Sequence, residues 1–146
     1  MVTFERASEE DVGIVVFVEA NIGEPRTYGR PLEFDAAAEE IRQNAFYLIR
    51  QGDAVVGTCA CRTRPDNSAY LSNIAVLPAF RGRGIGRAAM MFLLAECWAA
   101  DTIDLVTHPD NAAALNLYGS LGFAITARRE DPFGDGEPRL VLVRQC

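Results

Sequence analysis

Three glycines alternate with three arginines and an isoleucine in the segment RGRGIGR, residues 81–87, and a largely apolar run follows directly. Glycine disfavours a helix start, so its repetition at this point needs a reason. Glycines let backbone N–H groups turn into one concavity, and they remove the Cβ atoms that would block a ligand. A helix behind them adds its positive end. The segment therefore predicts an anion site, and a pyrophosphate is the ligand that suits it best. Arg81, Arg83 and Arg87 could reach phosphate oxygens or point into solvent.

Two familiar pyrophosphate motifs do not fit this segment. The dinucleotide fingerprint G-x-G-x-x-G opens a fold after its first strand and needs an acidic residue at the end of the next strand. Here the spacing is G-x-G-x-G past mid-chain, and Asp104 lies near the start of the next expected strand. The P-loop needs a lysine, and the chain has none. A glycine-rich turn without a ligand is the remaining alternative.

The charge balance restricts the class of partner. Arginine supplies all 14 basic residues against 20 acidic ones, which gives a net charge of −6 and a sequence pI of about 4.8. Nucleic acid rewards clustered cations, so it is not expected as a partner, whereas a cationic substrate is compatible with this charge. No run approaches the roughly 20 apolar residues of a membrane span, and the acidic start of the chain is unlike a signal peptide. We therefore expect a cytoplasmic protein that does not contact a membrane.

The four cysteines do not have the spacing of a metal site. Cys59 and Cys61 fall in a strand-like run, no CxxC pair occurs, and His108 is the only histidine. We expect no metal, and we expect at least Cys59, Cys61 and Cys97 to be small buried residues.

Hydrophobic periodicity and turn residues divide the chain into strands and helices. Ser8 and Asp11 have the spacing of a capping box, and Val12, Val15 and Val16 give the following helix its apolar stripe. The expected elements are a strand at Val2–Arg6, a helix ending near Ala20, a helix at Asp35–Gln43, a hairpin over 45–64 that turns at Gly52 and Asp53, a strand at 69–76, a helix after Gly86, a strand at 103–108, a helix at 109–121 closed by Gly122, and strands at 123–130 and 139–144. Residues 21–31 (NIGEPRTYGRP) and 131–138 (DPFGDGEP) are expected to be loops.

This order of elements favours one mixed sheet. An antiparallel meander in the middle is followed by β-α-β crossovers, which favour parallel neighbours. The sequence therefore predicts an α/β domain over residues 1–146 with helices on both faces of the sheet.

At this point the sequence resembles a known family. IAVLPAFRGRGIGRAAM is similar to the acyl-CoA-binding core of the GNAT superfamily of N-acyltransferases, whose motif R/Q-x-x-G-x-G/A follows a strand ending in V-x-P. Arg81, Gly84 and Gly86 behind Val76 and Pro78 match that motif. NAAALNLYGSLGF is similar to a second family motif, N-x-x-A-x-x-L-Y-x-x-x-G-F, matched by Asn111, Ala114, Leu117, Tyr118, Gly122 and Phe123. GDGEPRLVLVR resembles the C-terminal hairpin of bacterial members near the ribosomal-protein alanine N-acetyltransferase group.

The resemblance implies a fold and a cofactor. The fold would be the α/β (α+β) GNAT fold, with a central mixed, mostly antiparallel sheet of about seven strands, splayed in the middle and flanked by about four helices. The cofactor would be acetyl-CoA, with its diphosphate on the N–H groups of residues 81–86 and its pantetheine pairing with the backbone of Ile74 and Val76. The residues expected to bind it are Ile74, Ala75, Val76, Arg81, Gly82, Arg83, Gly84, Ile85, Gly86, Arg87, Asn111, Ala114 and Tyr118.

The resemblance also implies that Tyr118 is the general acid for the departing thiolate. A phenol, with a pKa near 10, is a workable acid toward a thiol with a pKa near 8.5. Helical spacing places Asn111, Ala114 and Tyr118 on one face, but the same spacing fits an ordinary buried stripe, so a core tyrosine is the alternative. Two interpretations are open for Asn111 as well: it could cap the helix, or it could contact the cofactor.

The resemblance does not identify the general base in this chain. Many relatives place a glutamate on one of the two splayed strands, where this chain has Ser72, Asn73, Val106 and Thr107. His108 has a suitable pKa, although a loop histidine before a proline needs no catalytic role. A water chain that drains to Ser72 or to the acids of the last loop is the preferred hypothesis.

Acceptor contacts in the family come mostly from the two loops at 21–31 and 131–138. Glu24, Tyr28, Asp131, Asp135 and Glu137 could hold a cationic amine there, or the charged ones could simply be solvated, and Arg139 could pair with one of the acids. The candidate acceptor-binding residues are Glu24, Tyr28, Ser72, Asn73, His108 and Asp135.

The leading hypothesis is an acetyl-CoA-dependent N-acetyltransferase that acts on a primary amine by direct attack. One alternative is a protein N-terminal or lysine acetyltransferase rather than a small-amine enzyme. Another is a non-catalytic acyl-CoA-binding sensor, which would keep the glycines but would not need Tyr118. Members of the family often form dimers, so the resemblance also allows a homodimer.

Overall fold

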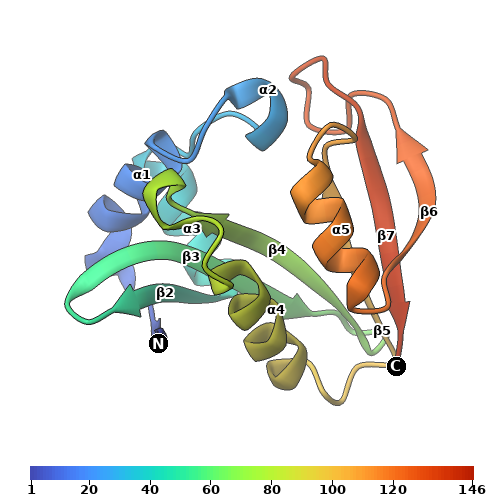
Figure 1. Cartoon of the computed structure of the whole chain (residues 1–146), viewed down its shortest axis with the longest axis horizontal. Coiled ribbons are helices and arrows are strands. Elements are labelled where there is room, and N and C mark those ends of the chain that lie inside the picture. Colours follow the sequence, from blue (N-terminus) through green and yellow to red (C-terminus); the bar gives the residue numbers. More distant parts are fainter. The chain divides into compact units, whose positions relative to one another are not determined.

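Seven strands and five α-helices follow one another along the chain in the computed structural model, which describes residues 1–146 (Figure 1). Two short 3-10 turns, Glu9–Asp11 and Pro78–Phe80, precede α1 and α4. The elements are β1 (Thr3–Arg6), α1 (Val12–Ala20), α2 (Pro25–Tyr28), α3 (Phe34–Gln43), β2 (Ala45–Gln51), β3 (Ala54–Thr63), β4 (Ser68–Val76), α4 (Ile85–Glu96), β5 (Thr102–Thr107), α5 (Ala112–Ser120), β6 (Ala124–Arg129) and β7 (Arg139–Gln145).

The strands are hydrogen-bonded in the order β1-β2-β3-β4-β5-β7-β6. The pairs β1/β2, β2/β3, β5/β7 and β6/β7 are antiparallel, and β4/β5 is parallel, with Ser68 opposite Thr102 and Tyr70 opposite Asp104. Helix α4 makes the crossover that a parallel pair requires. The predicted mixed, mostly antiparallel sheet of seven strands is confirmed.

The five helices agree with the expected number of about four. The fifth is α2, Pro25–Tyr28, a single helical turn within the segment expected to be a loop. Pro25 begins it at the first helical position, where a missing N–H costs nothing, and Gly29 ends it with a φ of +86°. The glycines and prolines of this segment are typical of a loop, and a helix of only four residues is too short to show a helical pattern among them.

The chain divides into two compact units. The first comprises Met1–Gly23, Pro31–Arg62 and Leu71–Trp98, and the second comprises Glu24–Arg30, Thr63–Tyr70 and Ala99–Cys146. Strand β4 contributes residues to both units, so each unit is described by its own contacts.

The first unit begins with the predicted capping box. Ser8 Oγ accepts the N–H of Glu10 at 3.3 Å, and Asp11 Oδ2 accepts the N–H of Ser8 at 2.9 Å. The predicted stripe of α1 needs one change, because Val12 and Val15 are buried as expected but Val18 is buried in place of the half-buried Val16.

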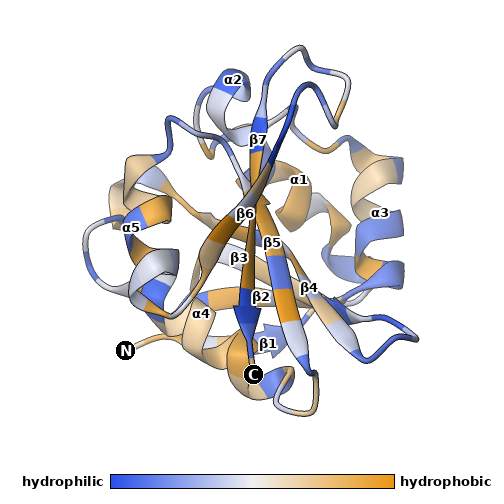
Figure 2. Cartoon of the chain, turned by 90° about the vertical axis from the view of Figure 1, so that its right-hand side faces the viewer, coloured by the Kyte–Doolittle hydropathy of each residue, from blue (hydrophilic) through white to orange (hydrophobic).

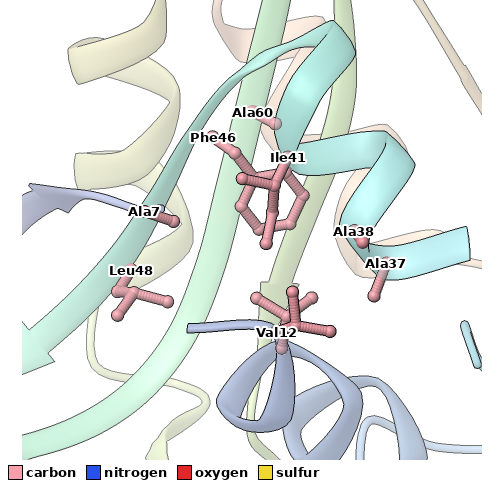
Figure 3. Packing of buried hydrophobic residues seen from close by; sticks show 9 residues of the cluster. Ala7, Val12, Ala37, Ala38, Ile41, Phe46, Leu48 and Ala60 are labelled. Atoms are coloured by element: carbon pink, nitrogen blue, oxygen red, sulfur yellow. The ribbon is translucent and has the colours of Figure 1, made fainter. Parts of the chain in front are cut away.

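Side chains of β2 pack on opposite faces of the sheet in this unit. Phe46 and Leu48 face α1 and α3, and Phe46 lies against Ile41 of α3 (Figure 3). Tyr47, between them, faces α4 and meets the ring of Phe92 edge-on, with the ring centroids 4.7 Å apart. The alternation follows the two-residue period of a strand and leaves helices on both faces.

The second unit packs around β5 and β7. Leu105 and Leu142 are opposite each other in the two strands, and both are buried. The middle of β7 is hydrophobic and its two ends are hydrophilic (Figure 2). Tyr118 of α5 and Phe123, just before β6, are also buried, with their ring centroids 6.2 Å apart.

The four cysteines are free thiols. Cys59, Cys61 and Cys97 are buried, as predicted, and Cys146 is exposed. No group of three or more histidine, cysteine, aspartate or glutamate side chains is placed to hold a metal ion. None of the helices combines the length and the apolar character needed to cross a membrane.

Strands β3 and β4 approach each other closely at Gly57. A Cβ added there would lie 2.2 Å from the carbonyl oxygen of Ala75. Next to it, the N–H of Leu77 donates to Val56 O at 2.9 Å, so the end of β4 is fixed against β3. Only glycine allows this spacing.

Gly57→Ala is therefore expected to destabilise the chain by about 1–3 kcal/mol, because backbone atoms must move to admit the methyl group. Urea unfolding measures the change. Gly13→Ala in α1 is the matched control, because an added Cβ meets nothing within 4 Å there and alanine is favoured over glycine in a helix by up to about 1 kcal/mol. A stability of Gly57→Ala equal to that of the unsubstituted chain would contradict the close approach of the strands.

Candidate functional site

The glycine segment forms a turn whose backbone only glycine adopts readily. Gly82 has a φ of +77° and Gly84 a φ of +80°, both in the left-handed region. A Cβ added at either position meets nothing within 4 Å, so the space in front of the turn is open. The segment is therefore shaped by its backbone, and its glycines are not explained by crowding.

Helix α4 begins at the end of this turn without a side-chain cap. Gly84 is its N-cap residue, and Ala88 donates to Gly84 O at 3.0 Å. The N–H groups of Ile85 and Gly86, in the first turn, therefore have no acceptor within the helix. Such N–H groups and the positive end of the helix together favour an anion.

Arg81 holds this turn in place. Its Nε donates to Val76 O at 3.0 Å, and its Nη2 donates to Ile22 O. The guanidinium thus joins the end of β4 to the segment after α1. The guanidinium of Arg83 lies over the ring of Phe80, 5.4 Å from its centroid. The Arg81 side chain therefore positions the loop, and the loop's N–H groups are the atoms suited to an anion.

On β4, Asn73 is part of a buried polar network that the sequence did not reveal. Asn73 Nδ2 donates to Glu19 Oε1 of α1 at 2.9 Å, and Asn73 Oδ1 accepts from Thr58 Oγ1 of β3 at 2.7 Å. Ser72 Oγ is buried without a hydrogen-bond partner. The signal that could have found Glu19 is its position as the only charged residue in the helix VGIVVFVEA.

Burial raises the pKa of Glu19 above its usual value. The carboxylate loses solvation, the hydrogen bond from Asn73 opposes this effect, and the negative charge of Glu40 on α3 adds to it. Glu40 itself accepts from Asn44 Nδ2 at 2.9 Å. The partner of Glu19 is a neutral amide and not an arginine.

In the second unit, Asn111 and Tyr118 lie on α5 as the second motif predicts. Asn111 Oδ1 accepts the N–H of Ala114 at 3.3 Å, so Asn111 is the cap of α5. Tyr118 is 9% exposed, and desolvation by burial raises the pKa of its phenol to about 12. The phenol therefore keeps its proton throughout the physiological range.

His108 is almost fully buried, and both of its ring nitrogens are engaged. Nε2 lies 2.8 Å from Glu137 Oε1, and Nδ1 accepts the N–H of Asp110 at 3.0 Å. Because Nδ1 accepts, the neutral ring carries its proton on Nε2 and donates it to Glu137. This arrangement leaves the neutral imidazole no lone pair with which to accept a proton from an amine.

Charged residues connect α2 to the loop between β6 and β7. Arg26 lies 2.5 Å from Asp110 Oδ2 and 3.3 Å from Glu137 Oε1. The hydrogen bond from Arg26 holds the pKa of Asp110 below its usual value. Arg30 Nη2 donates to Gly134 O at 2.9 Å.

Asp135 and Arg139 form a buried ion pair at 2.9 Å, as one of the sequence alternatives anticipated. The N–H of Glu137 donates to Asp135 at 3.0 Å, and it is the first cause of the lowered pKa of that carboxyl. Both oxygens of Asp135 are thus used within the loop. Glu24, the N-cap residue of α2, and Tyr28 at its last turn are exposed.

The candidate residues therefore fall into two groups. The first unit holds Ser72, Asn73, Ile74, Ala75, Val76, Arg81, Gly82, Arg83, Gly84, Ile85, Gly86 and Arg87, and the second unit holds Glu24, Tyr28, His108, Asn111, Ala114, Tyr118 and Asp135.

Comparison with known proteins supplies a family. The chain is 37% identical over 81 residues to the [ribosomal protein bS18]-alanine N-acetyltransferase of Escherichia coli K12, a match that covers 53% of this chain and 55% of the relative. The chain thus spans about half the length of the curated relatives it matches.

Solved structures extend the likeness to the whole fold. The crystal structure of the Escherichia coli ribosomal-protein-S18-alanine N-acetyltransferase superposes with a TM-score of 0.83 at 25% identity, over 99% of this chain and 94% of that one. Arabidopsis thaliana Naa50, solved with the bisubstrate analogue CoA-Ac-MVNAL, superposes with a TM-score of 0.83 at 19% identity, over 99% of each chain. The profile of the acetyltransferase (GNAT) family matches residues 16–123. The chain belongs to the GNAT acetyltransferase family.

Proposed function

We propose that this chain is an N-acetyltransferase that moves an acetyl group from acetyl-CoA to a primary amine by direct attack. The observation that carries the proposal is the turn at Gly82 and Gly84, where two left-handed glycines with open space around their Cβ positions lead into the start of α4, which has no side-chain cap. A diphosphate has two adjacent negative groups, which backbone N–H groups at such a turn and helix start would stabilise. Family membership and the likeness to acetyltransferases support the same conclusion.

This chain has the kinds of groups that each part of acetyl-CoA would need. The N–H groups of residues 81–86 suit the diphosphate, and the backbone of Ile74 and Val76 would pair with pantetheine amides. Val76 O already accepts from Arg81, so Val76 would contribute through its remaining hydrogen-bonding capacity. Asn111, Ala114 and Tyr118 on α5 complete the proposed binding set. When bound, acetyl-CoA supplies an activated acetyl group and a thiol leaving group.

Tyr118 is proposed to deliver the proton that the leaving sulfur needs. With a pKa of about 12, its phenol is a weaker acid than a thiol with a pKa near 8.5. The transfer therefore becomes favourable only when the acetylated nitrogen gives up its own proton at the same time. Tyr118 thus acts as a relay and is left protonated at the end.

The α-amino group of a protein N-terminus is the acceptor class that we favour over small amines. The curated relative is named as an alanine N-acetyltransferase of ribosomal protein bS18, and the bisubstrate analogue bound to Naa50 is CoA-Ac-MVNAL. An α-amino group, with a pKa near 8, is also neutral more often at pH 7 than a lysine side chain with a pKa near 10.4. The cytoplasmic location and the homodimer remain predictions from the sequence.

Calorimetry with acetyl-CoA and with CoA tests the first part of this proposal. The absence of heat at millimolar cofactor with the folded protein would overturn it. Thiol release is then measured with an alanine-initiated peptide, the same peptide N-terminally blocked and carrying a lysine, and spermidine. Release with the first peptide is the expected result. Tight binding without release for any amine would favour the sensor alternative.

Gly84→Leu is expected to abolish acetyl-CoA binding. The leucine side chain would fill the open space at the turn of Gly82 and Gly84, and it would strain a residue with a left-handed φ. Gly52→Leu in the β2–β3 turn is the matched control, since Gly52 also has a left-handed φ, of +61°, and open space around its Cβ. Both variants lose stability through the same strain, but only the first loses binding. Calorimetry measures acetyl-CoA binding by both variants. Equal binding by the two would argue against a diphosphate site at the turn of Gly82 and Gly84.

Tyr118→Phe is expected to lower kcat by about 10²–10⁴-fold, the usual contribution of general acid–base catalysis. Binding of acetyl-CoA should change little, because the ring and its packing against Phe123 are kept. The measurement pairs steady-state thiol release with calorimetry. A loss of binding as large as that of Gly84→Leu would instead make Tyr118 a structural residue.

A further inference from the structure

The Glu19 carboxylate is unusual among the buried charges of this protein. Its side chain belongs to a residue that is 8% exposed, and its hydrogen bond comes from the neutral amide of Asn73. The buried carboxylate of Asp135, by contrast, is paired with Arg139 at 2.9 Å. Burying a carboxylate without a cation costs stability, so this position is not explained by folding alone.

The network aims the amide of Asn73 at Glu19. Thr58 Oγ1 donates to Asn73 Oδ1 at 2.7 Å, which leaves Nδ2 as the group that faces the carboxylate. Three elements, α1, β3 and β4, therefore fix one hydrogen bond of 2.9 Å. Such a fixed orientation of a single carboxylate is what a proton-transfer group requires.

The charged group whose field reaches Glu19 is Glu40 on α3. Asn73 of β4, which donates to Glu19, and Thr58 of β3, which donates to Asn73, do not titrate. Burial and the negative charge of Glu40 both favour the protonated form, and they raise the pKa of Glu19 toward the range in which a carboxylate is an effective base.

Other candidates for the base are less suited. Both nitrogens of His108 are engaged by Glu137 and by the N–H of Asp110. Asp135 is neutralised by Arg139. Glu19 instead adjoins β4 at Asn73, directly before Ile74, whose backbone is proposed to line the acetyl-CoA site.

We infer that Glu19 is the general base of this enzyme, a catalytic residue supplied by helix α1 in place of the strand glutamate found in many relatives. The inference rests on the proposed acetyl transfer. An acceptor ammonium gives one proton to the Glu19 carboxylate and becomes a neutral amine. Its nitrogen then forms the bond to the acetyl carbon as the bond from that carbon to sulfur breaks. The second proton shed by the nitrogen ends on the sulfur through Tyr118, and Glu19 returns its proton to water.

The experiment compares the full chain with Glu19→Gln, Glu19→Asp and the exposed control Glu10→Gln, using an alanine-initiated peptide and acetyl-CoA. Glu19→Gln is expected to lower kcat by about 10²–10⁴-fold with acetyl-CoA binding retained. The acidic limb of the kcat/KM pH profile should disappear in Glu19→Gln and persist, with reduced kcat, in Glu19→Asp. Glu40→Gln should move that limb to lower pH, because it removes the charge that disfavours ionisation of Glu19.

A second readout does not depend on turnover. A raised native pKa means that folding favours the protonated carboxyl, so the stability contributed by Glu19 is complete below its unfolded pKa of about 4.5 and is lost as the pH rises through the native value. Glu19→Gln should therefore melt at a higher temperature than the unsubstituted chain at pH 7. The two melting temperatures should converge as the pH falls below about 4.5, whereas Glu10→Gln should show no such dependence.

The outcomes separate the inference from the function on which it rests. If Glu19→Gln keeps kcat within about twofold, which is far below the effect of a lost base, and keeps the same acidic limb, Glu19 is not the base although the acetyltransferase proposal stands. Loss of acetyl-CoA binding together with turnover in Glu19→Gln also overturns the inference, because it assigns Glu19 to structure. If the unsubstituted chain acetylates none of the amines tested, both proposals fall.

Discussion

The guanidinium of Arg81 bonds two main-chain carbonyls from different parts of the first unit, Val76 O at the end of β4 and Ile22 O after α1. A planar group with five donors can hold two acceptors in fixed directions, which a lysine cannot do. This contact sets where the glycine turn leaves the sheet, and hence where the first N–H groups of α4 point. It also joins the turn to the segment that follows Glu19, so one side chain links the proposed anion site to the helix that carries the proposed base.

Two buried carboxylates in this protein are treated in opposite ways. Asp135 is paired with Arg139 and accepts the N–H of Glu137, which makes it a fixed part of the β6–β7 loop. Glu19 is buried with a like charge nearby, which keeps its proton affinity high, and the hydrogen bond from the amide of Asn73 only partly opposes these effects. The first arrangement stabilises a loop, and the second gives up stability to retain a group that can exchange a proton.

Much of the fold could be predicted from the sequence because its signals are local. The capping box at Ser8, the left-handed glycine at the β2–β3 turn and the apolar alternation of β2 depend on neighbours a few residues away. Helix α2 was missed because four residues are too few to show a helical period. The turn at Gly82 and Gly84 was also predictable, since glycine is the residue that adopts the positive φ angles found there without strain.

The polar contacts of the candidate site could not be predicted in the same way. Whether His108 has an unused nitrogen depends on Glu137, which lies 29 residues further along the chain. The environment of Glu19 depends on Asn73, 54 residues away, and on Thr58. Spacing identifies which residue types are present on an element, but their protonation and hydrogen bonding follow from tertiary packing.

The contacts between α2 and the β6–β7 loop have an evolutionary consequence. Arg26 touches Glu137 and Arg30 holds Gly134 O, so two segments separated by about a hundred positions meet through the same few side chains, and Arg26 also touches Asp110 between β5 and α5. An insertion or deletion in one segment would break the contacts of the other. Relatives that have diverged toward acceptors of a different shape should therefore have remodelled these two segments jointly, while the glycine turn, which has no part in those contacts, stayed unaltered.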